Sequence, residues 1–103
     1  MTHRTTTQDI ERQLQALEHS LTELNMMPLS DRLHVRVGSK TYGIAFRLER
    51  HTVEGAYGNP PHGIPDFLGM TRREAFDTLH TINRSLWAVL NARREASRTE
   101  ASA

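Results

Sequence analysis

The side chains of this chain that are best suited to chemistry are its histidines and arginines, and their spacing limits what they can do. No two of the six histidines stand at the HxH or HxxxH spacing that sets two metal ligands side by side. His62 and Asp66 are close in sequence, but neither a nucleophile nor a glycine-rich phosphate loop accompanies them. Cysteine is absent, which excludes a cysteine nucleophile and cysteine-ligated zinc. The sequence therefore predicts no enzyme, no cofactor and no metal site.

The basic residues gather in two places that suit the binding of anions or of a partner. One group alternates with apolar residues between positions 32 and 51, and the other lies at the start and along one flank of the last predicted helix. A helix N-terminus attracts anions, and guanidinium groups bind phosphate or carboxylate oxygens in pairs of hydrogen bonds. Ordinary solvated surface charge is the alternative for both groups. The candidate partner- or nucleic-acid-binding residues are Arg32, His34, Arg36, Arg47, Arg72, Arg73, Arg84 and Trp87.

Residues 32–50 predict a β-hairpin, because apolar and polar side chains alternate with a period of two on both sides of a turn. The apolar row consists of Leu33, Val35, Val37, Tyr42, Ile44, Phe46 and Leu48. A turn at 38–39 suits type II′ geometry and would set Val35 opposite Tyr42, whereas a turn at 39–40 would set it opposite Ile44. Either register produces one apolar face and one basic face.

An amphipathic helix is predicted on each side of the hairpin. In the first, over residues 8–26, apolar residues recur every three or four positions, and Pro28 is expected to end it. Its leucines also fit about two and a half heptads, so a coiled coil is the alternative to a core helix. The second helix, over residues 71–95, opens with a capping box of Thr71 and Glu74.

The remaining segments complete the predicted domain, which covers residues 8–95. Residues 52–70 hold four of the six glycines and three of the four prolines, which predicts a loop whose first residues can add a short third strand. Residues 1–7 predict a disordered tail, and residues 96–103 a polar one. The expected fold is α+β: helix, β-hairpin, possible third strand and helix, with two helices packed on one face of a small antiparallel sheet.

The last helix opens with Arg72-Arg73-Glu74-Ala75, and with this element order the chain resembles double-stranded RNA-binding domains. Those domains begin their last helix with a phosphate clamp of the type Lys-Lys-x-Ala-Lys. The resemblance covers most of the chain as topology, but only these four residues as a motif. Phe76 stands where the clamp has its last base, and the Gly-Pro-x-His-type loop between the first two strands is absent. The resemblance implies phosphate contacts by the two arginines.

Composition and charge narrow the choice of partner and of compartment. The net charge is +1, from 13 basic and 12 acidic residues, which argues against a strongly basic nucleic-acid-binding protein. No apolar run approaches the roughly 20 residues of a membrane span, and no signal-peptide core follows the first methionine. We therefore expect a soluble, cytoplasmic protein without a membrane partner.

The function that these features favour is a small non-enzymatic interaction module, a protein-binding adaptor or modulator of the size that phages and mobile elements often encode. Homodimer formation is expected as well, because a two-stranded sheet leaves open edges that a second copy can pair with. The alternative is a nucleic-acid-binding protein that uses the basic hairpin face and the N-terminus of the last helix.

Overall fold

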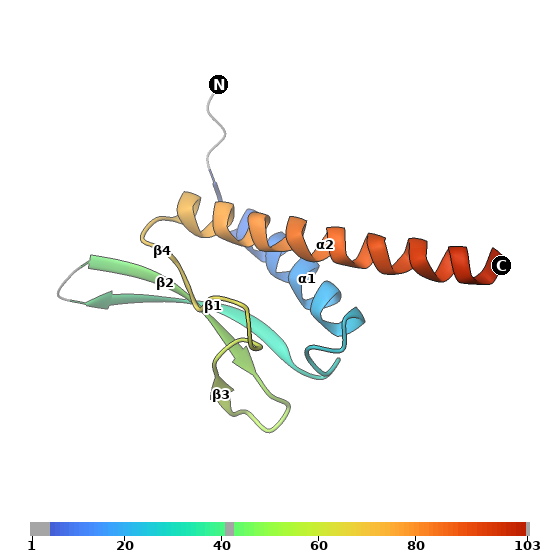
Figure 1. Cartoon of the computed structure of the whole chain (residues 1–103). Coiled ribbons are helices and arrows are strands. Elements are labelled where there is room, and N and C mark those ends of the chain that lie inside the picture. The colour runs from blue at the N-terminus through green and yellow to red at the C-terminus, as the bar shows by residue number, and fades with distance from the viewer. Residues whose placement is uncertain (1–4, 41–42, 103) are drawn as a thin grey trace.

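The computed structural model describes residues 5–40 and 43–102 and has two helices on a small antiparallel sheet (Figure 1). In chain order the elements are α1 (Thr7–Glu23), β1 (Arg32–Lys40), β2 (Gly43–His51), β3 (Tyr57–Gly58), β4 (Phe67–Gly69) and α2 (Arg72–Ser102). The predicted α+β architecture of helix, hairpin and helix is confirmed.

Side-chain caps fix the start of each helix. At α1, Thr6 and Asp9 form a capping box in which the Thr6 N–H donates to Asp9 Oδ2 at 2.8 Å and the Asp9 N–H donates to Thr6 Oγ1 at 3.3 Å. At α2, the Glu74 N–H donates to Thr71 Oγ1 at 3.1 Å, as the sequence predicts. The Glu74 carboxylate accepts from the N–H of Met70 at 3.0 Å, so it also ties the preceding loop to the helix.

Both helices end at residues other than those predicted. Asn25 adopts a left-handed conformation with φ of 59°, and its N–H and that of Met26 donate to carbonyls of the last turn of α1 at 3.1 and 2.9 Å. These bonds end α1 at Glu23, several residues before Pro28, so the predicted end at Met26 is wrong. The prediction that the second helix ends near residue 95 is also wrong, because α2 continues to Ser102, and this stretch includes the good helix formers Ala96, Arg98, Glu100 and Ala101.

The two helices lie side by side and run in the same direction (Figure 1). Near their middles, Asn83 Nδ2 donates to the backbone carbonyl of Gln13 at 2.9 Å and to its side-chain Oε1 at 2.8 Å. Farther along, Arg94 Nη2 bonds Glu23 Oε2 at 3.1 Å. Because α1 ends there, the end of α2 projects beyond the body of the protein, and the side chains of residues 92–99 are exposed.

In the sheet, β2 lies between β1 on one side and the short strands β3 and β4 on the other. The hairpin register sets Val35 opposite Leu48 and Val37 opposite Phe46, and pairing continues to Lys40 opposite Gly43. Both predicted registers are therefore wrong. Shifting an antiparallel pair by any even number of residues keeps every side chain on its own face, so alternation alone cannot choose among these registers. The residues between the two strands lie outside the described part of the chain.

The third strand predicted in residues 52–57 is not formed over that range, and two short strands, β3 and β4, add to the sheet instead. Residues 52–56 form a turn, in which the Gly55 N–H donates to the Thr52 carbonyl at 3.0 Å, so β3 begins only at Tyr57. β4 then adds a second short partner for β2, within the segment predicted as loop. Leucines dominate the core between the sheet and both helices, and the most completely buried are Leu17, Leu21, Leu48, Leu68 and Leu79.

Candidate functional site

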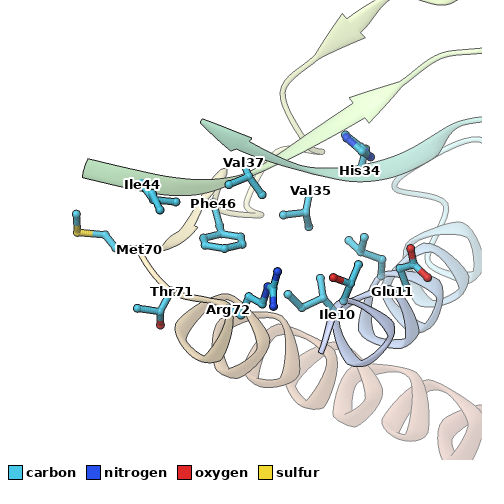
Figure 2. A pocket seen from close by; sticks show the side chains of 12 residues that line it. Ile10, Glu11, His34, Val35, Val37, Ile44, Phe46, Met70, Thr71 and Arg72 are labelled. Carbon is cyan, nitrogen blue, oxygen red and sulfur yellow. The ribbon is translucent and has the colours of Figure 1, made fainter. Parts of the chain in front are cut away.

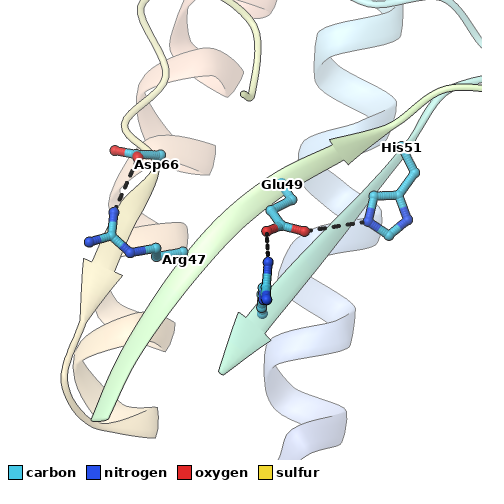
Figure 3. A network of polar contacts seen from close by, with 5 residues as sticks. Arg47, Glu49, His51 and Asp66 are labelled. Atoms are coloured by element: carbon cyan, nitrogen blue, oxygen red, sulfur yellow. Dashed lines mark hydrogen bonds and ion pairs between the residues drawn. The ribbon is translucent and has the colours of Figure 1, made fainter. Parts of the chain in front are cut away.

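The outer face of the hairpin, which the helices do not cover, carries two of the predicted basic residues, Arg36 and Arg47, each beside an acid (Figure 3). Arg36 and Arg47 are directly opposite each other in the ladder. Arg36 Nη1 lies 3.4 Å from Glu49 Oε1, and Arg47 Nη1 lies 3.4 Å from Asp66 Oδ2. These two carboxylates offset the repulsion that facing guanidinium groups would otherwise suffer. The face is therefore a mixed-charge network and not a row of unpaired cations.

The other two predicted hairpin residues lie on the same face, nearer its base. The His34 ring lies 5.2 Å from that of His51, which in turn meets the edge of Tyr57 with ring centroids 4.3 Å apart. Arg32 donates to backbone carbonyls of the α1–β1 connection at 2.8 and 3.1 Å. Among the described residues, no three histidine or acidic side chains are placed to hold a metal ion.

The predicted residues of α2 do not join the hairpin face, because the helices lie on the opposite side of the sheet. Arg73 pairs with Asp77 at 3.3 Å, one turn along the helix. Arg84 and Trp87 are exposed and lie about 20 Å farther along α2 than its first turn. Only Arg72 lies next to the hairpin, where it lines a groove. The candidate residues thus occupy three separate surfaces.

The groove beside Arg72 is the feature that sequence reasoning missed. It lies between the inner face of the hairpin and the first turns of both helices, and its volume is about 490 Å³ (Figure 2). Its lining is mostly apolar, and the Arg72 side chain points in between Phe46 and Ile10. The lining residues are Thr7, Ile10, Glu11, Leu14, His34, Val35, Val37, Ile44, Phe46, Met70, Thr71 and Arg72.

The groove exists because the apolar row of the hairpin is longer than the helices can cover. At the base of the hairpin, Leu33 and Leu48 are buried beneath the helices. Toward the tip the same row is open: Val37 is 58% exposed and Ile44 50%, and Met70 at the entrance to α2 is 48% exposed. Alternation in the sequence predicts that all of these side chains face inward, but it does not predict how far the two helices extend over them.

Comparison with known protein families, curated proteins and solved structures finds no match to this chain. No helix in the described part of the chain is long and apolar enough to cross a membrane.

Proposed function

We propose that this protein is a small non-enzymatic protein-binding module that takes up an apolar segment of a partner in the groove at the hairpin tip. The exposure of Val37, Ile44 and Met70 around a single concave site is the observation that carries the proposal. Clustered apolar side chains at a concave surface gain free energy when a partner removes them from water. Glu11 and Arg72 add charged groups to this apolar lining, and protein interfaces likewise combine apolar with polar side chains.

The ion pairs that the arginines form within the protein favour a protein partner over nucleic acid. A protein binds nucleic acid through Lys and Arg side chains that neutralise phosphate groups and so release the counterions bound to them. Arg36, Arg47 and Arg73 each have a carboxylate within 3.4 Å, and a nucleic acid would have to compete with it. Because the candidate basic residues also lie on separate faces, a single duplex would contact only some of them.

The test is a selection of displayed random peptides on the full chain, run in parallel on two variants. Val37→Asp places a charge in the groove and should abolish enrichment. Val53→Asp makes the same change at an exposed valine in the β2–β3 turn, outside the groove, and should leave enrichment intact. Circular dichroism and urea unfolding establish beforehand that both variants are folded.

Peptides rich in apolar residues that bind the wild type and Val53→Asp, but not Val37→Asp, would support the proposal. Two results would contradict it: no enrichment on the wild type, or enriched peptides that bind all three proteins equally. In the second case the binding surface lies elsewhere on the molecule.

A further inference from the structure

We infer that the partner segment binds the β1 edge as an added strand, with apolar side chains in the groove and acidic side chains on the opposite face. This inference rests on the proposed function and specifies the partner's conformation and charge. Strand addition to an exposed sheet edge is a general mode of peptide recognition, in which main-chain bonds supply affinity and alternate side-chain pockets supply specificity.

The free edge of β1 can be assigned from two hydrogen bonds. The N–H of Leu33 donates to Glu18 Oε1 of α1 at 3.0 Å, so it points away from β2. The N–H of Leu48, which lies opposite Val35, donates to the Asp66 carbonyl on the far side of β2 at 2.6 Å. In an antiparallel pair, alternate residues direct their backbone groups to the same side. Leu33, Val35 and Val37 therefore point their backbone groups toward the open edge.

α1 provides a hydrogen-bond acceptor for only one of these three backbone N–H groups, that of Leu33. Glu18 accepts from Leu33, whereas no residue in the described part of the chain accepts a hydrogen bond from the N–H of Val35 or Val37. Both valines also line the groove. Unpaired edge donors and an open apolar groove thus lie on the same stretch of β1, and a single extended segment can satisfy both.

The side-chain pattern of such a segment follows from the pleat of β1. Side chains opposite Val35 and Val37 would enter the groove, and the intervening ones would lie on the outer face beside His34 and Arg36. Among the described side chains of that face, Arg32, Arg36 and Arg47 are three guanidinium groups, and they stand against two carboxylates, those of Glu49 and Asp66. Basic groups are therefore in excess there, and Asp or Glu at the outward positions of the segment would complement them.

The same charge pattern disfavours a second copy as the added strand. β1 contains no acidic residue, because its sequence is Arg-Leu-His-Val-Arg-Val-Gly-Ser-Lys. In an antiparallel self-pairing of β1 that keeps the apolar faces together, Arg36 would face Arg32, His34, Arg36, Gly38 or Lys40 of the other copy, and none of these is acidic. Like charges directly opposite each other destabilise a strand pair. We therefore assign the edge to a different protein with alternating apolar and acidic residues.

The experiment measures binding of labelled eight-residue peptides to the full chain by fluorescence anisotropy. The probe alternates Val and Glu, and its controls are a Val/Lys alternation and a peptide with four Val followed by four Glu. We expect the alternating Val/Glu peptide to bind at least tenfold more tightly than either control. Equal binding of the Val/Lys peptide would overturn the acidic pattern, and no binding of the Val/Glu peptide at about 1 mM would overturn the inference.

Backbone methylation then tests the strand directly. N-methyl groups on alternate peptide residues block the donors on one edge only, so one methylated series should lose at least tenfold in affinity while the other binds like the parent. Loss in the Val series indicates antiparallel addition, and loss in the Glu series indicates parallel addition. If both series bind like the parent, the segment is not a strand, although apolar binding in the groove would still stand.

A matched pair of protein variants separates the backbone donor from the side chain. Val37→Pro removes an edge N–H that takes no part in the β1–β2 ladder, so the fold should persist. Val37→Ala keeps that N–H and shortens the side chain. We expect a larger loss of peptide affinity for Val37→Pro than for Val37→Ala, and the reverse order would contradict strand addition.

Discussion

Val37 and Phe46 lie directly opposite each other in the β1–β2 ladder, yet Val37 is 58% exposed and Phe46 only 7%. Both side chains belong to the inner face of the hairpin. Phe46 reaches the core cluster that includes Leu68 and Ala75, whereas Val37 lies on the edge strand beyond the cover of α1. The boundary between core and groove therefore runs between two cross-strand neighbours.

This boundary predicts unequal effects on stability. Phe46→Ala should lower the free energy of unfolding by about 3–5 kcal/mol, because it leaves a cavity in the core. Val37→Thr, which keeps the shape and the strand preference of valine, should change it by less than about 0.5 kcal/mol. Urea unfolding measures both values. A loss at Val37 comparable to that at Phe46 would mean that the groove is covered in solution.

Gly69 predicts a second difference in stability. It joins β4 to α2 with φ of +142°, and a Cβ added there would lie 2.5 Å from the Cβ of Glu74. Gly69→Ala should therefore cost about 1–3 kcal/mol, since it adds backbone strain and disturbs the helix start. Gly58→Ala is the matched control, because nothing lies within 4 Å of its added Cβ. Equal melting temperatures for the two variants would contradict this account.

The ion pairs of the hairpin and of α2 predict weak nucleic-acid binding. Anisotropy titrations with duplex DNA, duplex RNA and single strands should show no saturable binding at about 50 mM salt. The alternative function predicts the opposite: saturable binding that weakens steeply at about 200 mM salt. Loss of that binding in Arg72→Ala/Arg73→Ala or in Arg32→Ala/Arg36→Ala would show which surface carries it.

The homodimer predicted from the sequence can be assigned to a surface by sedimentation. Trp87 is an exposed aromatic residue on α2, whereas the β1 edge has only basic and neutral residues to offer a second copy. We expect a dimer at micromolar concentration that Trp87→Ser dissociates and Val37→Asp leaves intact. A wild-type monomer would contradict the dimer, and a dimer dissociated by Val37→Asp would mean that a second copy occupies the groove.

Local patterns in the sequence were sufficient for the elements of the fold. Helical spacing in both helices, the Thr71 cap and the alternation of the hairpin are properties of neighbouring residues, and each predicted its element correctly. The ends of the two helices were not predicted correctly. Asn25 ends α1 in a left-handed conformation that proline-based reasoning does not foresee, and the polar end of α2 is helical without any apolar stripe.

The hairpin register, the ion pairs and the groove were decided only by the tertiary structure. The two predicted registers and the observed one all satisfy the same alternation, and in the observed one Arg36 lies within reach of Glu49 and Arg47 within reach of Asp66 in the β3–β4 connection. Two arginines of the basic row in the sequence thus pair with carboxylates in the fold. Sequence alternation determined which side chains of the hairpin face inward. Where the inward row is left uncovered depends on the length and placement of two helices that are distant in sequence, because burial is a property of packed surfaces and not of a single strand.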